Sequence, residues 1–433
     1  MLRLFQVDRQ AQRLVVRGPG FREKILARVT LKCIKALPMS KHAKPLRMAG
    51  RLFFLVLLAL VSGMFTGCQD TECASRLQVN GSPIFLNGIN YPWKVYGGDF
   101  GGIKRWKKTG IATNYQTYDR EFALIKNTGS RVVRWWMFPD LRGDGIRIED
   151  GQVQAGPTLM NDVQAALKLA EKHDLYLVLC LFSFEAFAPE RTDGGIRIRN
   201  LEDILADANL RESLLKNVIG PLARAIEQSP YGNRLLAFDL INEPEWALKG
   251  KNPYGDPVYY PLDSVRPVSH EFMEAFLLDL SYAIREHGSA RITVGQAAPR
   301  WPRAWKKLNL DFYQWHIYSW MEEKAIYREA APTELCAPIV FGEAPVGPLI
   351  SGDERPTSSD AESERSGPGL SHREDGLPGS HTVPELSTNP AVSFQSMVQT
   401  MERNGWAGIW VWSFQRPVPD GANLDILKPT FVP

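Results

Sequence analysis

Eight short apolar segments recur along the chain, and stretches with helical spacing separate most of them. The segments cover residues 83–91, 131–138, 175–184, 235–242, 291–295, 312–318, 338–343 and 408–414. They are continuously apolar rather than alternating, which is typical of strands that are covered on both faces, as in parallel sheets. Between them, apolar residues at spacings of three and four, as in residues 163–173, predict amphipathic helices.

This succession of strands and helices predicts an α/β fold, a (β/α)8 TIM barrel formed by one domain over residues 69–433. An open doubly wound sheet is the alternative, but no glycine-rich phosphate turn follows the first strand. Residues 351–390 fit neither pattern, because they are rich in Ser, Pro, Gly and charge and contain no Phe, Trp or Tyr. We expect a disordered insertion there, either a tolerated loop or a lid over a cleft.

Residues 1–68 form a basic leader that continues into an apolar run. Thirteen Lys or Arg and two acidic residues precede residue 52, the apolar run covers residues 52–65, and small residues precede Cys68. This order is typical of a secretory signal peptide, and the run is shorter than the roughly 20 residues that span a membrane. The segment FTGC (65–68) resembles a bacterial lipobox, which implies a cell-envelope protein lipid-anchored through Cys68. Plain secretion and an uncleaved anchor are the alternatives, and Met39 or Met48 are alternative starts.

Charge and cysteine content narrow the functional classes. The whole chain carries +3 and residues 1–51 carry +11, so the remainder carries −8, a balance that disfavours binding to nucleic acid. After Cys68 there remain Cys73, Cys180 and Cys336, too few for a disulfide framework, although a bridge between Cys73 and Cys336 stays open in an oxidising compartment. None has His or Cys neighbours at zinc-ligand spacing. No other ligand cluster in the sequence suggests a metal or an organic cofactor, so we predict neither.

The ends of the predicted strands hold the candidate functional residues, because the carboxyl ends of barrel strands meet in one cleft. These residues are Asn90, Trp93, Arg134, Ser183, Asn242, Glu243, His316, Tyr318, Glu343 and Trp412. Two of them are glutamates, Glu243 after the fourth strand and Glu343 at the end of the seventh. Two carboxyl groups that face each other across a sugar can cleave a glycosidic bond, one as proton donor and one as nucleophile. The pair therefore predicts a glycosidase site.

Residues near this pair favour the same interpretation. Arg134 is expected to keep the Glu343 carboxylate ionised, with a hydrogen bond from Tyr318, and Asn242 to hold a sugar 2-hydroxyl. The side chains that offer flat faces for pyranose rings are Trp93, Trp135, Trp136 and Trp412. Taken singly, each residue has a structural alternative: a core histidine for His316 and a structural ion pair for Arg134. We expect Glu185 and Glu245 to be loop residues rather than catalysts.

The order of these motifs resembles the retaining glycoside hydrolases of the (β/α)8 clan that includes the family 5 cellulases and β-mannanases, over residues 78–414. INEP (241–244) is similar to that clan's acid/base motif and FGE (341–343) to its nucleophile strand, which implies Glu243 as general acid and base and Glu343 as nucleophile. WHIY (315–318) matches its His-x-Tyr motif, which implies His316 near the acid/base and Tyr318 near the nucleophile. VRWW (133–136) and WSF (412–414) resemble the segments that supply its strand-two arginine and its sugar-platform tryptophan.

One position departs from the family 5 pattern. Family 5 enzymes commonly carry a His at the end of the third strand, where this chain reads LFSF (181–184). The subsite around the reacting sugar, and with it the substrate, is therefore expected to differ.

Together these features predict a monomeric retaining glycoside hydrolase that cleaves a β-linked polysaccharide or oligosaccharide, β-mannan or β-1,4-glucan, by double displacement. One alternative is a non-catalytic glycan-binding surface lipoprotein on the same scaffold. Another is a phosphate-handling barrel enzyme, which is disfavoured because residues 415–425 after the last strand form no glycine-rich phosphate site. The sequence leaves open which glycan is cut, whether cleavage is internal or terminal, and whether water or another sugar accepts the glycosyl group.

Overall fold

The computed structural model describes residues 76–346, 349, 390–414 and 427–431. The chain divides into two compact units, Met1–Glu72 and Cys73–Pro433, and every described residue belongs to the second. The leader predicted for residues 1–68, with lipidation at Cys68, lies outside the described residues. So does the insertion predicted for residues 351–390, apart from Pro390.

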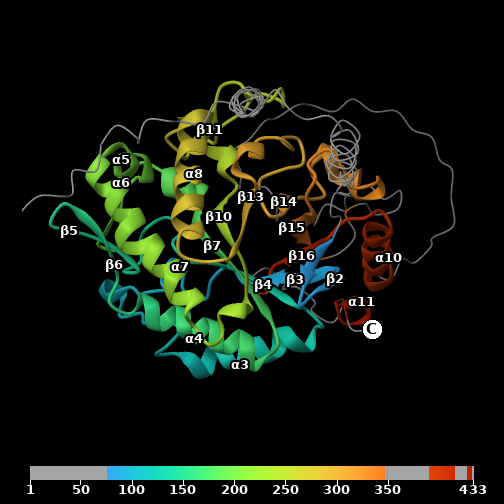
Figure 1. Ribbon diagram of the computed structural model, residues 1–433, viewed down its shortest axis with the longest axis horizontal. Coiled ribbons are helices and arrows are strands. Elements are labelled where there is room, and N and C mark those ends of the chain that lie inside the picture. Colours follow the sequence, from blue (N-terminus) through green and yellow to red (C-terminus); the bar gives the residue numbers. More distant parts are fainter. Residues whose placement is uncertain (1–75, 347–348, 350–389, 415–426, 432–433) are drawn as a thin grey trace, which may run out of the picture. The chain divides into compact units, whose positions relative to one another are not determined.

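Eight parallel strands close into a barrel at the centre of the second unit (Figure 1). In chain order they are β3 (Leu86–Asn90), β4 (Val132–Trp136), β7 (Tyr176–Ser183), β10 (Leu235–Asn242), β13 (Arg291–Gln296), β14 (Tyr313–His316), β15 (Ile339–Pro345) and β16 (Gly408–Trp412). Each strand pairs with its neighbours in this order, and β16 pairs with β3 to close the ring. Each of the eight predicted segments overlaps one of these strands, with β13 and β15 extending past the predicted ends to Gln296 and Pro345, so the predicted (β/α)8 barrel is confirmed.

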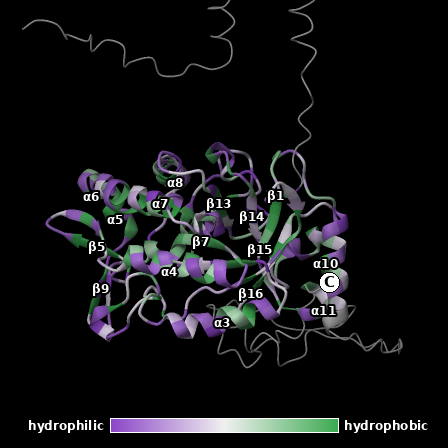
Figure 2. Cartoon of the chain, turned by 60° about the horizontal axis from the view of Figure 1, so that its bottom comes forward, coloured by the Kyte–Doolittle hydropathy of each residue, from purple (hydrophilic) through white to green (hydrophobic). Residues whose placement is uncertain are grey.

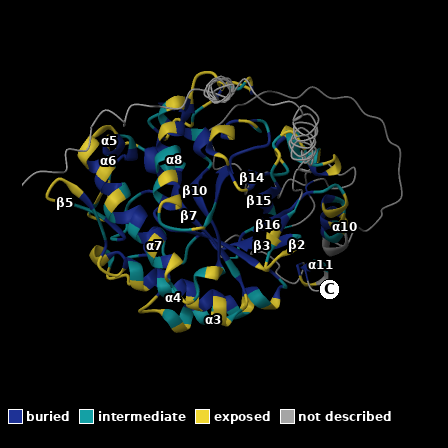
Figure 3. Cartoon of the chain, in the orientation of Figure 1, coloured by how far each residue is buried: buried dark blue, intermediate teal, exposed yellow. Residues whose placement is uncertain are grey.

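Helices cover the outside of most of the barrel. They are α3 (Tyr115–Asn127), α4 (Leu159–Lys172), α5 (Leu201–Ala206), α6 (Ala208–Leu214), the π-helix η3 (Leu215–Ile219), α7 (Gly220–Glu227), α8 (His270–Arg285), α10 (Pro390–Arg403) and α11 (Lys428–Phe431). Exposed and buried residues alternate along them in Figure 3, and the hydropathy colours of Figure 2 alternate in the same way, as expected for amphipathic helices. After β13 and β14 the described connections contain only the 3-10 turns η6 (Lys306–Leu308) and η7 (Glu322–Arg328).

The barrel interior is layered. A small apolar cluster fills the barrel near the amino-terminal ends of the strands. It includes Leu86, Val132, Val178, Ala237, Phe312, Val340 and Trp410. Side chains alternate along a strand, so residues further along the same inner faces form a second layer, which is polar and buried. That layer contains Asn90, Arg134, Cys180, Asp239 and Gln314. The candidate residues at the carboxyl ends of the strands therefore pack against this polar layer, which separates them from the apolar cluster.

In the described part of the chain, four short two-stranded sheets lie in the segments that precede or connect the barrel strands. They are β1 (Leu77–Val79) with β2 (Ser82–Ile84), β5 (Ile146–Glu149) with β6 (Gln152–Ala155), β8 (Arg191–Asp193) with β9 (Ile196–Ile198), and β11 (Leu248–Lys249) with β12 (Val268–Ser269). Among the described residues, no helix combines the length and the apolar character that a bilayer crossing requires.

The described cysteines differ in state. Cys180 is a free, buried thiol, as predicted for a small core residue. Cys336 is disulfide-bonded. Its predicted partner, Cys73, lies outside the described residues, so the Cys73–Cys336 pairing stays a prediction.

Candidate active site

Glu243 sits at a sharp turn of the backbone just after β10. Its φ of 49° and ψ of 47° are left-handed, a region that residues other than Gly, Asn and Asp seldom adopt. Its backbone N–H donates to the carbonyl of Gly295 at 2.6 Å, and Pro244 starts the 3-10 turn η5 (Pro244–Ala247). Strained backbone of this kind clusters at functional sites, where the surroundings hold a side chain in one place.

The carboxyl group of Glu243 is held by neutral partners. The ring Nδ1 of His316 lies 2.8 Å from Oε1, and the indole N–H of Trp246 donates to Oε2 at 3.1 Å. Burial raises the pKa of Glu243 to about 7 and lowers the pKa of His316 to about 4, so the imidazole is neutral at neutral pH. No Lys or Arg of the described chain forms an ion pair with this carboxyl group. Glu243 is therefore suited to hold a proton near pH 7.

The carboxylate of Glu343, near the end of β15, has charged and hydroxyl partners instead. Arg134 donates from Nη1 to Oε1 at 2.7 Å, and the Tyr318 hydroxyl donates to Oε2 at 2.7 Å. Burial raises the pKa of Glu343, and the charge of Arg134 and the Tyr318 hydrogen bond oppose that rise. One oxygen of Glu243, one oxygen of Glu343 and one ring nitrogen of His316 lie within 4.8 Å of one another. Carboxyl groups this close do not both ionise readily, and Arg134 favours Glu343 as the anion.

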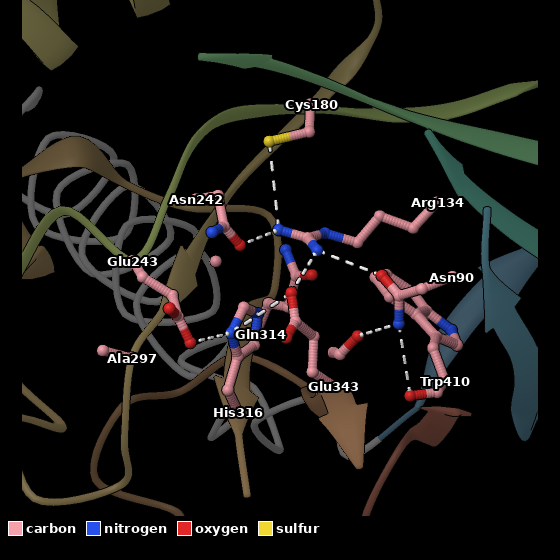
Figure 4. A network of polar contacts seen from close by, with 12 residues as sticks. Asn90, Arg134, Cys180, Asn242, Glu243, Ala297, Gln314, His316, Glu343 and Trp410 are labelled. Atoms are coloured by element: carbon pink, nitrogen blue, oxygen red, sulfur yellow. Dashed lines mark hydrogen bonds and ion pairs between the residues drawn. The ribbon is translucent and has the colours of Figure 1, made fainter. Parts of the chain in front are cut away.

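Arg134 contacts several side chains of the site with one guanidinium group (Figure 4). Its fully buried guanidinium donates to Asp239 at 2.9 Å, Asn90 at 3.0 Å, Asn242 at 2.8 Å and Glu343 at 2.7 Å. A Cβ atom on residue 295 would lie 2.7 Å from Nη2, so the guanidinium reaches this position only because residue 295 is glycine. The planar fork thus fixes the Glu343 carboxylate and the Asn242 amide with a single side chain.

Three tryptophans form an aromatic wall beside the carboxyl pair. The ring centroids of Trp93 and Trp136 are 5.3 Å apart, those of Trp136 and Trp412 are 5.7 Å apart, and those of Trp93 and Trp412 are 6.5 Å apart. Trp93 and Trp412 are half-buried, so each keeps part of its ring accessible. The prediction that Trp135 offers a stacking face is wrong. It alternates with Trp136 along β4 and is fully buried in the core outside the barrel, where its indole N–H donates to Asp99.

Sequence reasoning missed three residues of the site. Asp239 is the buried counter-ion of Arg134, and Gln314 donates to it at 3.1 Å. The sequence carried a signal for Asp239, because a charged residue inside an otherwise apolar strand needs a buried partner. Trp246 donates a hydrogen bond to Glu243. The sequence signal for this contact was that Trp246 follows Glu243 by three residues, in a turn that begins with Pro244.

The other predicted residues lie as follows. Ser183 ends β7, and Asn242 donates to its hydroxyl at 3.3 Å. Glu245, expected to be a loop residue, is fully buried and accepts hydrogen bonds from the backbone N–H of Ala297 at 2.9 Å and from Trp305 at 2.7 Å. It joins the connections after β10 and β13, which is a supporting role.

The carboxyl groups and the imidazole of this site are close enough together to resemble a metal site. In the described part of the chain, Glu243, His316 and Glu343 are the one group of carboxyl, thiol and imidazole donors compact enough for an ion. Arg134 already brings positive charge to Glu343, so these side chains fit chemistry between two carboxyl groups better than ligation of a cation.

No family model matches the chain. Two curated relatives are both named mannan endo-1,4-beta-mannosidase. The one from Cryptopygus antarcticus is 25% identical over 200 residues, which is 45% of this chain and 47% of the relative. The one from Mytilus edulis is 25% identical over 212 residues, 47% of this chain and 53% of the relative. The chain thus spans about half the length of the curated relatives it matches.

Solved structures share the fold over a larger part of the chain. The β-1,4-mannanase of the sea hare Aplysia kurodai gives a TM-score of 0.57 at 20% identity, with 82% of this chain and 94% of that chain covered. The β-1,4-D-mannanase of Cryptopygus antarcticus gives a TM-score of 0.58 at 19% identity, with 82% and 93% covered. These structures confirm the barrel fold, and the two curated relatives confirm the likeness to β-mannanases that the motifs predict.

Proposed function

We propose that this chain is a retaining glycoside hydrolase that cleaves β-mannan within the polymer. The observation that carries the proposal is a pair of carboxyl groups with oxygens less than 4.8 Å apart, one next to neutral donors and one next to an arginine. Retaining enzymes hold their carboxyl groups about 5–5.5 Å apart, whereas inverting enzymes hold them about 6.5–9.5 Å apart. Two relatives that are mannan endo-1,4-beta-mannosidases support β-mannan over β-1,4-glucan.

In the first step, Glu343 attacks the anomeric carbon. The bond from Glu343 to that carbon forms while the glycosidic bond breaks, and Glu243 gives its proton to the departing oxygen. Arg134 and Tyr318 keep Glu343 anionic and aimed, because they occupy both of its oxygens. Burial keeps the Glu243 proton available at neutral pH.

In the second step, Glu243 acts as base. It takes a proton from water as the water oxygen bonds to the anomeric carbon, and Glu343 leaves as a carboxylate. Two inversions give net retention, and a sugar hydroxyl in place of water would give transglycosylation. Asn242 is placed to hold the 2-hydroxyl of the reacting sugar, while Trp412 and Trp93 offer the faces on which sugar rings stack.

The test is sugar release from mannans, glucans, xylans and galactans by protein that starts after Cys68, with Glu243→Ala and Glu343→Ala alongside. We expect mannan oligosaccharides of several lengths from the unmodified protein and none from the variants. NMR of the first product should show the β-anomer. An α-anomer would rule out retention. Glycan binding by all three proteins without release would instead support the non-catalytic alternative.

The rate should fall as pH rises through about 7. Glu243 must be protonated for the first step, and burial places its pKa at about 7, so kcat/KM should drop about tenfold for each further pH unit. His316, with its pKa lowered to about 4, should add no charge change in this range. The measurement is kcat/KM from pH 4 to 9 on mannopentaose. On a substrate whose leaving group needs no protonation, kcat/KM should not fall above pH 7. A fall on that substrate as well would contradict the assignment of Glu243 as the proton donor.

We also propose export and lipid anchoring through Cys68. The order of basic, apolar and small residues in the leader supports export, and the disulfide at Cys336 is of the kind that forms in oxidising compartments. Cells that express the full chain should incorporate labelled fatty acid into the protein, and a Cys68→Ala variant should not. Equal labelling of both proteins would exclude this anchor.

A further inference from the structure

A third carboxyl group lies beside the acid/base residue and has no part in the steps above. Glu185 belongs to the turn η2 (Phe184–Phe187) after β7, which packs against η5, the turn after Glu243. In the described part of the chain no Lys or Arg forms an ion pair with Glu185, and Ser183 is the one side chain that donates to it. A half-buried carboxylate without a counter-ion is unfavourable for the fold, which points to a ligand as its missing partner.

Glu185 is joined to the predicted sugar contact by a short chain of hydrogen bonds. The Ser183 hydroxyl donates to Glu185 and accepts from Asn242 Nδ2 at 3.3 Å. Asn242 Oδ1 accepts from Arg134 at 2.8 Å, so the orientation of the amide is fixed. Ser183 and Asn242 are paired directly across β7 and β10, which places the amide and the Ser183 hydroxyl on adjacent strand ends, with Glu185 two residues further along. One N–H of Asn242 remains for a ligand.

We propose that Glu185 is a specificity-determining residue, whose carboxylate accepts a hydrogen bond from the 3-hydroxyl of the sugar that Glu343 attacks. This inference rests on the proposed function, because its ligand is the substrate of that site. Asn242 would hold the 2-hydroxyl and Glu185 the hydroxyl on the adjacent carbon. Ser183, which stands where family 5 enzymes commonly carry a His, is small and directs the carboxylate.

A fixed amide and a fixed carboxylate distinguish sugars by the geometry of two neighbouring hydroxyls. In mannose the 2- and 3-hydroxyls lie on the same side of the ring, and in glucose they lie on opposite sides. Asn242 is held on a paired strand and Glu185 is held by the hydrogen bond from Ser183, so the two contacts favour one of these arrangements. Burial raises the pKa of Glu185 to about 7, so its carboxyl group is partly neutral at pH 7, and in either protonation state it keeps an oxygen that can accept a hydrogen bond. Glu185 thereby favours mannose over glucose at the reacting position.

The test compares an aryl β-mannotrioside with the same compound lacking the 3-hydroxyl on its reacting sugar. At about pH 8, where Glu185 is mostly ionised, the unmodified protein should prefer the complete substrate by about 10- to 100-fold in kcat/KM, the range for a hydrogen bond to a charged group. Glu185→Ala should lose that factor on the complete substrate and nothing on the deoxy compound. Glu185→Gln should keep part of the preference, because its amide oxygen still accepts. The control is Glu190→Gln, which changes the same charge at an exposed position paired with Arg197.

Equal losses of Glu185→Ala on both substrates, or no loss on either, would overturn the inference. A second measurement needs no catalysis: calorimetric binding of mannopentaose to Glu343→Ala with and without Glu185→Ala. We expect at least tenfold weaker binding in the double variant, and unchanged binding would also count against the inference. If the unmodified protein cleaves no glycan but this binding difference appears, the proposed hydrolysis fails and the role of Glu185 stands. If the protein cleaves mannan but the Glu185 variants behave like the unmodified protein, the proposed hydrolysis stands and the proposed role of Glu185 fails.

Discussion

Replacing Glu343 by alanine is expected to lower kcat on mannopentaose by at least about 10⁴-fold, because no other group can then attack the anomeric carbon. Azide added to this variant should restore turnover on a substrate with an activated leaving group, since a small anion fits the space that the carboxylate leaves. The product should be the α-glycosyl azide, formed with inversion. Rates are measured by release of the chromogenic group and configuration by NMR.

The matching change at Glu243 separates the two roles. Glu243→Ala should form the glycosyl-enzyme from the activated substrate at a near-normal rate, because that leaving group needs no proton, and should then stall. Azide should release it as the β-glycosyl azide, with retention. Azide products of the same configuration from both variants would show that the two carboxyl groups do not hold the roles assigned to them.

Replacing Arg134 by methionine is expected to destabilise the fold by about 3–5 kcal/mol, because Asp239 and Glu343 would remain buried without a counter-ion. Activity should also be lost, since Glu343 would no longer be held as an anion. The measurement is the free energy of unfolding in urea at pH 7. The control is Arg266→Met, whose guanidinium pairs with Glu202 and Asp203 at the surface and should cost much less.

A triple variant that removes all three charges tests whether unpaired buried charge causes the loss of stability. Arg134→Met combined with Asp239→Asn and Glu343→Gln removes every charge of the trio and should recover much of the lost stability while staying inactive. If the triple variant is as unstable as Arg134→Met alone, then lost packing around the guanidinium, and not unpaired charge, explains the effect.

The fold could be predicted in some detail because its signal is repeated. Each barrel strand is buried on both faces, so each leaves a continuous apolar run, and eight such runs leave few alternatives. Glu243, Glu343, His316 and Tyr318 could be placed together because barrel topology brings strand ends into one cleft. Their pairing, with His316 on Glu243 and Tyr318 on Glu343, is the one that the family resemblance implied.

Other features of the site depend on three-dimensional contacts that a linear pattern does not record. Trp135 and Trp136 are adjacent in the sequence, and the sequence does not show which one faces into the barrel. In the structure Trp136 packs beside Trp412 at the site, whereas Trp135 is buried in the core outside the barrel. Glu245 follows a strand end like a catalytic residue, yet its oxygens are taken by Ala297 and Trp305. Glu185 looked like an ordinary loop residue because its contact with Ser183 depends on how the turn folds back.

The arrangement around Arg134 has a consequence for electrostatics during turnover. With Arg134 positive, Asp239 and Glu343 negative, and Glu243 and His316 neutral, the group carries a net charge of −1 before the reaction. In the glycosyl-enzyme, Glu343 is a neutral ester and Glu243 has become the anion, so the sum is again −1. Catalysis by this route never creates or removes charge inside the barrel. It moves one negative charge between oxygens that lie less than 4.8 Å apart, with the same fixed cation below them throughout.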